Sequence, residues 1–328
     1  MHAIRLHQFG PPGNLRYERI DAPQPGDGEV AVRVEAAGVH LLDTSLRAGQ
    51  VGPPTPLPAL PHVPGREVAG EVEEVGPGVE PAWLGRRVVV HLGREPRHGG
   101  YAERTIAAAS SLHPLPDGLG AGEAVAMIGT GRTALAILET ARLGADDVVL
   151  VTAAAGGLGT LLVQAALRAD ALVVAVAGGP EKVARASALG AQIAVDYGVP
   201  GWAEAVRERL GGYELSVVFE SVGGTIADEA VGLLPPGGRL VTYGWSSGEP
   251  LSLGAQELER RGIRAGFEIG HAVFGRPGGI RGLETEALAA AARGELTPAV
   301  QTFPLAQAAD AHAALEERRT VGKVVLVP

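Results

Sequence analysis

Cysteine is absent from this chain of 328 residues, and lysine is almost absent, because arginine fills 26 of the 28 basic positions. Without cysteine the chain cannot form a disulfide, an iron–sulfur cluster or a thiolate-bound zinc site, and it has no cysteine nucleophile. Any redox chemistry must therefore come from a bound cofactor.

Long basic blocks and long apolar runs are missing as well. The 28 basic and 37 acidic side chains give a net charge of −9, so we expect no nucleic acid and no membrane as a partner. No stretch of about 18 apolar residues occurs, and the first ten residues lack the apolar run of a signal peptide. We expect a cytoplasmic protein.

The pattern of apolar residues divides the chain into two textures. Alternating residues predict strands at Glu29–Ala36, Glu67–Val75 and Arg87–His91, with proline- and glycine-rich connections between them. From about Ala121, helical patterns alternate with short β-branched runs. Gly122 to Arg142 indicates two helical stretches around Gly129-Thr130-Gly131.

Alternation of strands and helices in the second texture predicts an α/β fold with a doubly wound parallel sheet. The predicted strands are Asp147–Ala153, Ala171–Ala177, Gln192–Asp196, Glu214–Phe219, Arg239–Tyr243 and Ile263–Ile269. Helices follow near Leu283–Arg293 and Leu305–Arg318. We expect the final strand, Lys323–Val327, to return to the first part of the chain.

A glycine turn joins the strand that ends at Thr152 to the helix Thr160–Arg168. Strand, tight turn and helix together form the usual context of a dinucleotide phosphate site, because small residues let the backbone approach the pyrophosphate and the helix N-terminus offers N–H donors. The spacing departs from G-x-G-x-x-G. The residues predicted to bind the phosphates are Ala155, Gly156, Gly157, Leu158 and Gly159.

The end of the next strand bears on the choice between NADPH and NADH. An acidic residue is usual there in NAD sites, whereas here Gly178 and Gly179 leave room for a 2′-phosphate. Lys182 and Arg185 could pair with such a phosphate, and Glu181 is the counterargument. We favour NADPH over NADH.

Several segments, in this order, carry a resemblance that covers essentially the whole chain. They are Val34–Asp43, Pro64–Val72, Gly99–Glu103, the glycine turn, Val218–Gly224, Pro236–Val241 and Thr320–Val325. The chain resembles the zinc-independent medium-chain dehydrogenases/reductases, close to the NADPH:quinone oxidoreductases and zeta-crystallin.

The resemblance implies a fold, domain limits and an assembly. It implies a GroES-like, β-rich catalytic domain, split in sequence over residues 1–122 and 268–328, which holds a Rossmann dinucleotide-binding domain at 123–267. It also implies an active site between the domains. A homodimer joined through the edges of two Rossmann sheets is a further implication.

Zinc is not expected. Zinc alcohol dehydrogenases similar to this chain carry a cysteine ligand where His40 stands and a histidine ligand where Arg66 stands. His40 could bind a metal and Glu67 could help, but Arg66 places a permanent cation where a ligand should be. A catalytic zinc site needs three protein ligands and an open position.

Without a Lewis acid, hydride transfer requires an acceptor that takes hydride readily, so quinones and α,β-unsaturated carbonyl compounds fit. A donor near the substrate oxygen would stabilise the anion that develops there. Two alternatives stay open: an enoyl-thioester reductase, and a non-catalytic NADPH-binding protein with a structural or regulatory role.

Three residues are the catalytic candidates. His40 stands where quinone reductases similar to this chain usually have asparagine, and it could donate to the substrate oxygen or be scaffolding. Asp43 could orient His40, or could cap a helix Thr44–Ala48. Thr133 matches a threonine that lies near the nicotinamide in relatives, or it simply opens a helix.

The remaining cofactor candidates lie at strand ends, where ligands bind to parallel sheets. Tyr197 matches a position near the adenosine phosphate, and Lys323 lies in a Gly-Lys-Val turn that relatives bring toward the cofactor. The others are Ser221, Val222, Tyr243 and Gly244. Phe267 and Phe274 could line the nicotinamide pocket or belong to the core.

Overall fold

The computed structural model describes residues 1–50, 56–93, 96–266 and 278–328 and divides the chain into two compact units. The first unit comprises Met1–Thr130 and Glu284–Pro328, and the second comprises Gly131–Leu283. The first limit lies eight residues after the predicted one at 122, and the second lies sixteen residues after the predicted one at 267. The assignment of these units as a catalytic domain and a dinucleotide-binding domain stays a prediction. Phe267 and Phe274 lie outside the described residues.

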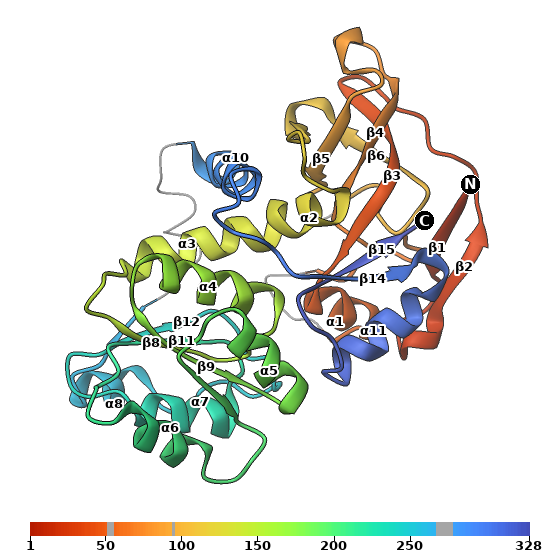
Figure 1. The fold of residues 1–328 in the computed structure, drawn as a ribbon. Helices are drawn as coiled ribbons and strands as arrows, with labels where there is room; N and C mark the ends of the chain where they lie inside the picture. Colours follow the sequence, from red (N-terminus) through yellow and green to blue (C-terminus); the bar gives the residue numbers. More distant parts are fainter. Residues whose placement is uncertain (51–55, 94–95, 267–277) are drawn as a thin grey trace. The chain divides into compact units, whose positions relative to one another are not determined.

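A seven-stranded sheet forms the frame of the first unit (Figure 1). Its long central strand, β3 (Glu29–Val39), pairs antiparallel with β4 (Glu67–Val75) on one edge. Its other edge pairs with β6 (Arg104–Ala108) and β15 (Lys323–Val327). The outer strands are β5 (Arg87–His91), β7 (His113–Pro114) and β14 (Val300–Pro304). The predicted return of the final strand is therefore confirmed.

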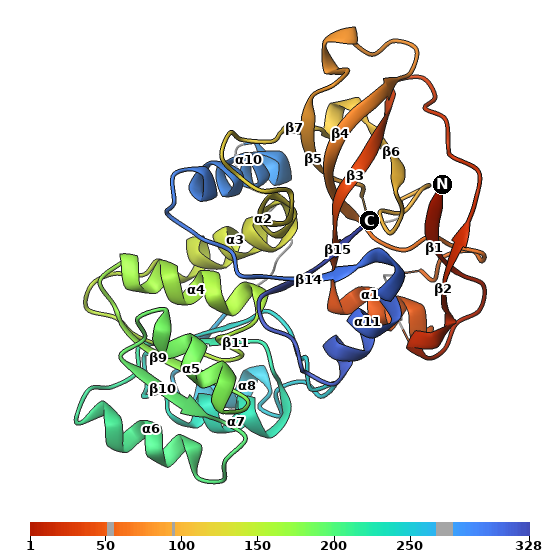
Figure 2. The same cartoon turned by 45° about the vertical axis from the view of Figure 1, so that its right-hand side comes forward.

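Smaller elements complete the first unit. A hairpin pairs β1 (His2–Leu6) with β2 (Leu15–Arg19). Helices α1 (Leu41–Ala48) and α11 (Ala308–Glu316) lie side by side (Figure 2), joined by the Arg47–Glu316 ion pair. Short 3-10 turns are Pro12–Asn14, Pro81–Trp83, Ala109–Ser111 and Leu305–Gln307. Alternate valines of β3, β4 and β5 build the core, as the period of two predicts.

One helical segment differs from its prediction. Helix α2 (Ala121–Ala126) continues through a π-helical turn, Met127–Gly131, into α3 (Arg132–Ala141). The three residues Gly129-Thr130-Gly131 therefore widen the helix and do not separate two stretches. π-turns of this kind occur often at functional sites.

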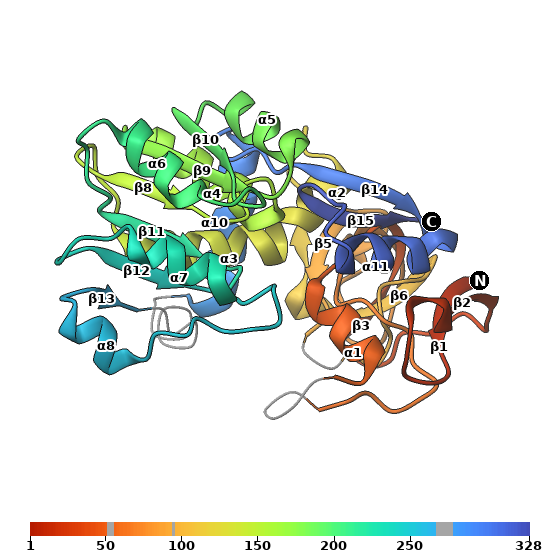
Figure 3. The same ribbon diagram turned by 90° about the horizontal axis from the view of Figure 1, so that it is seen from below.

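The second unit contains a six-stranded parallel sheet in the order β10-β9-β8-β11-β12-β13 (Figure 3). Its strands are β8 (Val148–Val151), β9 (Leu172–Ala177), β10 (Ile193–Asp196), β11 (Val217–Glu220), β12 (Arg239–Thr242) and β13 (Arg264–Ala265). In sequence order this arrangement is 3-2-1-4-5-6, the order of the Rossmann fold. The order reverses between β8 and β11, so ligands are expected at the carboxyl ends of those strands.

Helices cover both faces of this sheet, which confirms the predicted fold class. One face packs against α6 (Trp202–Leu210), α7 (Gly224–Gly232) and α8 (Ala255–Arg260). Helix α3 and helix α4 (Gly157–Arg168) lie on the other face (Figure 1). The remaining helices are α5 (Pro180–Ala188) and α10 (Gly279–Ala292). In the described part of the chain, every helix is too short or too polar to cross a membrane.

Candidate functional site

Helix α1 begins at His40, whose extended backbone (φ −106°, ψ 153°) makes it the N-cap residue. The Asp43 carboxylate reaches back and accepts the His40 backbone N–H at 2.8 Å. The expectation that Asp43 caps a helix Thr44–Ala48 is therefore wrong, because the helix starts one turn earlier and Asp43 is its third residue. Asp43 holds the backbone of His40, and no contact between Asp43 and the imidazole is observed among the described residues.

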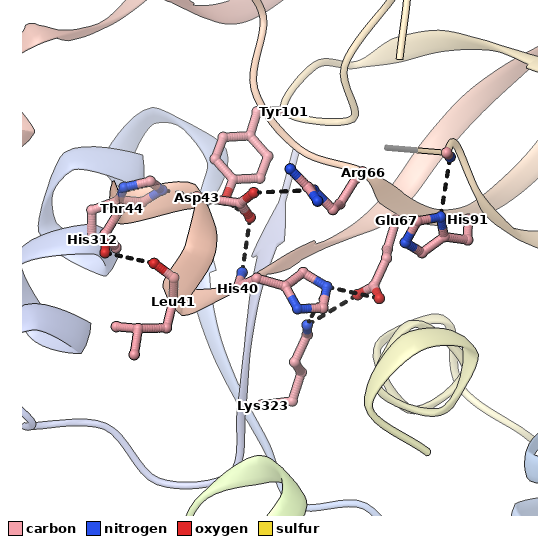
Figure 4. A network of polar contacts seen from close by, with 11 residues as sticks. His40, Leu41, Asp43, Thr44, Arg66, Glu67, His91, Tyr101, His312 and Lys323 are labelled. Carbon is pink, nitrogen blue, oxygen red and sulfur yellow. Dashed lines mark hydrogen bonds and ion pairs between the residues drawn. The ribbon is translucent and has the colours of Figure 1, made fainter. Parts of the chain in front are cut away.

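Asp43 is almost completely enclosed, with 3% of its surface exposed. Its Oδ2 atom also accepts the hydroxyl of Tyr101 at 3.1 Å, and its Oδ1 atom lies 3.5 Å from Nε of Arg66 (Figure 4). Burial and the neighbouring Asp43 carboxylate raise the pKa of Tyr101. Asp43 thus connects the His40 backbone, the Tyr101 hydroxyl and the Arg66 side chain.

His40, Glu67 and Lys323 form a compact charged cluster (Figure 4). The Nε2 atom of His40 lies 2.7 Å from Oε1 of Glu67, and Nζ of Lys323 lies 3.0 Å from Oε2 of the same carboxylate. Lys323 Nζ also lies 3.0 Å from His40 Nε2. Neither Glu67 oxygen forms a well-aligned hydrogen bond, so both contacts are ion pairs. The cluster unites β4, the start of α1 and the final strand.

Two glycines make room for the Glu67 side chain. A Cβ atom at Gly38 in β3 would press against Glu67 Oε2 and lie 3.1 Å from Lys323 Cε. A Cβ atom at Gly129, in the π-turn, would overlap Glu67 Oε1. Any larger residue at either position would displace the carboxylate.

The charge of Glu67 depends on its cationic neighbours. Complete burial by itself would raise the pKa of this carboxyl group. His40 and Lys323, with a smaller effect from His91, outweigh burial and hold the pKa of Glu67 well below its ordinary value. Glu67 is therefore an anion throughout the physiological range.

His40 is the member of the cluster that solvent reaches, with 27% of its side chain exposed. The Lys323 ammonium has no acceptor, so in its 3.0 Å contact it donates and the lone pair of Nε2 accepts. Nδ1 has no hydrogen-bond partner in the described ranges. It is the ring nitrogen left for an exchange of protons with a ligand.

These residues do not fit a catalytic zinc site. Three or more His, Cys, Asp or Glu side chains do not gather anywhere in the described chain in a way that could hold a metal ion. The two potential ligands, His40 and Glu67, both contact the Lys323 ammonium. A second cation, the Arg66 guanidinium, lies beside Asp43. Zinc demands at least three ligands at such a centre.

In the second unit, the glycine turn has the form that a dinucleotide phosphate requires. Ala153 takes a left-handed φ of 48° and its carbonyl accepts the Gly156 N–H at 2.8 Å. A Cβ atom at Gly159 would overlap the Ala153 carbonyl, so helix α4 approaches the strand closely. Gly156 caps α4, which begins at Gly157, and its first N–H groups are available to an anion.

Gly178 and Tyr197 meet at the end of β9 together with Asp196, an acidic residue to which no role was assigned from the sequence. A Cβ atom at Gly178 would lie 3.0 Å from the Tyr197 ring. Asp196 Oδ1 accepts the backbone N–H of Gly179 at 2.9 Å. Arg185 pairs with Glu181 at 3.1 Å, while Lys182 is half-buried at the start of α5.

The other predicted cofactor residues lie on adjacent strand ends. Ser246 N donates to the Ser221 carbonyl and Ser247 N to that of Val222, which joins the loops after β11 and β12. Glu220 is fully buried at the base of the first loop and accepts the Val222 N–H at 2.6 Å. Burial raises the pKa of Glu220, against the effect of its backbone hydrogen bonds.

Tyr243 and Gly244 follow β12 in this row, with Tyr243 N donating to the Glu220 carbonyl at 2.9 Å. Thr133 is the second residue of α3. Of the predicted catalytic residues, the structure brings His40 and Asp43 together, and it adds Lys323, which was predicted as a cofactor residue. Their roles toward a cofactor stay predictions.

Four residues of these sites were not among those predicted to act in catalysis or to bind the cofactor: Glu67, Tyr101, Arg66 and Asp196. Glu67 and Arg66 lie in the Pro64–Val72 segment, and Tyr101 lies in Gly99–Glu103, so both motifs marked the right places. Their partners lie far away in the sequence, so no local pattern predicts those contacts.

Comparisons with known proteins identify the family. The "Alcohol dehydrogenase GroES-like domain" model matches residues 26–117, and the "Zinc-binding dehydrogenase" model matches residues 189–326. The 2-haloacrylate reductase of a Burkholderia species is 33% identical over 99% of this chain and 98% of that protein. The chain belongs to the medium-chain dehydrogenase/reductase family.

Two quinone oxidoreductases are similar over the same span. That of Pseudomonas aeruginosa is 32% identical, with 99% of both chains covered. The crystal structure of Escherichia coli quinone oxidoreductase complexed with NADPH superposes on this chain with a TM-score of 0.85. The two sequences are 28% identical, and the match covers 100% of both chains.

The Glu67 cluster predicts a strong coupling between two buried charges. Lys323→Met leaves the buried carboxylate with one cationic contact, so the free energy of unfolding should fall by about 3–5 kcal/mol in urea denaturation. The double variant Lys323→Met/Glu67→Gln removes both charges and should recover a large part of that loss. If the double variant loses the sum of the two single effects, the cluster does not act as a unit.

A second prediction concerns His312, which is fully buried against Tyr101, with its Nε2 atom 3.2 Å from the hydroxyl oxygen. Burial is the main cause that lowers the pKa of His312 to about 4. Between pH 6.5 and pH 4 the unfolded chain therefore binds more protons, so stability is full above pH 6.5 and falls as pH falls.

The expected loss is up to about 3 kcal/mol across this interval, and it levels off below pH 4. His312→Gln should flatten the corresponding part of a plot of unfolding free energy against pH, measured by urea titration at each pH. An unchanged slope would mean that His312 takes up its proton at the same pH in the folded and the unfolded chain. His2→Gln, at an exposed histidine stacked on Tyr17, is the matched control.

Proposed function

We propose that this protein is an NADPH-dependent oxidoreductase that reduces a quinone or an α,β-unsaturated carbonyl compound without a metal ion. The observation that carries the proposal is the His40–Glu67–Lys323 cluster, in which an ammonium group takes the place beside the histidine that a metal would need. The names of its relatives, quinone oxidoreductase and 2-haloacrylate reductase, support this class of acceptor.

The glycine turn supports the cofactor. Its left-handed Ala153, the close approach at Gly159 and the start of α4 fit a pyrophosphate. When bound, the nicotinamide supplies a hydride. Ser221, Val222, Tyr243 and Gly244, on the loops after β11 and β12, would hold the ribose and nicotinamide at the strand ends.

His40 would supply what the acceptor needs besides the hydride. An enone gains the hydride at its β-carbon and a proton at its α-carbon, and negative charge develops on its oxygen in between. With Nε2 held against Glu67, a proton on Nδ1 can stabilise that oxygen and then be delivered. Asp43 keeps His40 in place through the backbone.

Two substitutions at His40 test this role. His40→Ala should lower kcat/KM for an enone about 10²- to 10⁴-fold, because the proton donor is lost. His40→Asn keeps a hydrogen-bond donor without a titrating proton, so it should retain more activity and lose the fall in rate that the wild type shows as pH rises. Identical pH profiles for the wild type and His40→Asn would remove His40 from proton delivery.

Preference for NADPH over NADH is part of the proposal and rests on Gly178 and Lys182. Asp196 bears against it, because its carboxylate lies at the same turn, although both Gly179 N–H and Gly198 N–H occupy its Oδ1 atom. A carboxylate so bonded is held by the backbone and is less available to a ribose hydroxyl.

Lys182→Ala should weaken NADPH binding by about 1–3 kcal/mol and leave NADH binding unchanged, because only NADPH carries the 2′-phosphate. Fluorescence titration of both cofactors measures the difference. Arg207→Ala, which removes an exposed arginine paired with Glu204 on α6, serves as the charge-matched control. Equal losses for both cofactors would refute a phosphate-binding role for Lys182.

We further propose a cytoplasmic homodimer. Strand β13 is an edge of the sheet in the second unit, and its two residues, Arg264 and Ala265, are exposed. An edge strand with free backbone groups can pair with its copy in a second chain.

A further inference from the structure

A cavity of about 710 Å³ lies within the first unit, behind helix α1. Its described walls come from β1, the inner face of α1, the loop that leads into β4 and the loop before Tyr101. This volume is in the range of small-molecule sites. Much of the lining is apolar, with Leu42, Leu46, Leu57 and Val63 among its members.

The charged residues of the cavity are mainly basic. Among the described residues, two acidic ones line it, Asp21 and Asp43, against five arginines: Arg5, Arg47, Arg66, Arg97 and Arg104. Three of the five are neutralised by carboxylates outside the cavity. Arg5 pairs with Glu18, Arg47 with Glu316, and Arg104 with Glu73 and Glu74.

Arg66 is different, because its guanidinium is enclosed but incompletely bonded. Its side chain is 14% exposed, and its one polar contact with a described residue is the 3.5 Å approach of Nε to Asp43 Oδ1. Asp43 cannot do more, since Oδ2 already accepts from His40 and Tyr101. The two Nη groups of Arg66 therefore make no hydrogen bond with the described chain.

The Nη groups of Arg66 are not among the fully buried unbonded atoms of the described chain, so a ligand can reach them, and a planar anion that accepts both would form the bidentate pair that arginine favours. His62 lines the same cavity. Burial is the main cause that lowers its pKa, so at neutral pH it is an uncharged hydrogen-bonding group beside Arg66. A cation, a neutral polar group and apolar walls suit a small carboxylate with a hydrocarbon body.

We propose that the Nη groups of Arg66 bind the carboxylate of an anionic acceptor in this cavity, so that the physiological substrate is an α,β-unsaturated carbonyl compound that carries a carboxylate. The inference rests on the proposed function. Asp43 connects the two sites, because it contacts Arg66 with one oxygen and the His40 backbone with the other. An acid held by Arg66 would thus lie against Asp43, three residues after His40, although His40 is not among the described residues that line the cavity.

A matched pair of acceptors tests the proposal: (E)-4-oxopent-2-enoate, which carries a carboxylate, and its methyl ester, which is uncharged at the same end. Either acceptor gains a hydride at one alkene carbon and a proton at the other, while NADPH is oxidised to NADP⁺. Wild-type enzyme should prefer the carboxylate. Arg66→Gln should raise KM for the carboxylate about 10- to 150-fold and leave KM for the ester nearly unchanged.

Two further variants sharpen the result. Arg66→Lys keeps a positive charge without the two parallel donors, so it should recover part of the affinity for the carboxylate. Arg86→Gln removes an arginine that stacks on Trp83 away from the cavity, and both KM values should stay as in the wild type. Equal losses for both acceptors in Arg66→Gln, or no preference in the wild type, would overturn the anion site and leave the reductase proposal intact.

Failure of the proposed function would be visible separately. If wild-type protein binds NADPH but reduces neither these acceptors nor any quinone, the reductase proposal is wrong. The anion site is then decided by thermal unfolding with added 4-oxopent-2-enoate. A carboxylate-dependent rise in Tm for the wild type that is lost in Arg66→Gln supports the site, and no rise overturns it.

Discussion

The buried carboxylate of Glu67 joins three segments of the first unit that are far apart in the sequence. Glu67 could not remain charged at complete burial without His40 and Lys323, because desolvation alone opposes its ionised form. The three groups come from β4, from the residue before α1 and from the last strand of the chain. Gly38 and Gly129 leave the space that the carboxylate occupies. The end of the chain is thereby tied to its first sheet by electrostatics as well as by strand pairing.

The same contact determines what His40 can do. With Nε2 facing Glu67 and Lys323, its chemistry toward a ligand is confined to Nδ1, and the orientation of the ring needs no help from Asp43. The Lys323 ammonium contacts one oxygen of Glu67 and Nε2 of His40, the two potential ligands that these side chains would offer a metal ion. The cluster that joins three distant segments of the first unit therefore also fixes which nitrogen of His40 stays unoccupied by the described chain.

Most of the fold could be predicted from the sequence because its signals are local. The alternation in Glu67–Val75, the β-branched runs and the glycine turn each declare their structure within ten residues or so. The π-turn at Met127–Gly131 could not be predicted, since the glycines there also suit a break. Gly129 in this turn also leaves the space for Glu67, which lies some sixty residues away in the sequence, so its contact is not visible in the local pattern.

The site itself shows a sharper limit. Asp43 has the spacing of a residue that assists His40, yet it is saturated by the His40 backbone and by Tyr101, which lies 58 residues further along the chain. That pairing exists only in the folded protein. The residue predicted to orient the His40 ring instead holds the His40 backbone, and the Nη groups of Arg66 are left without a partner in the described chain. The arginine that argues against zinc in the sequence is, for the same reason, the residue on which the proposed anion site rests.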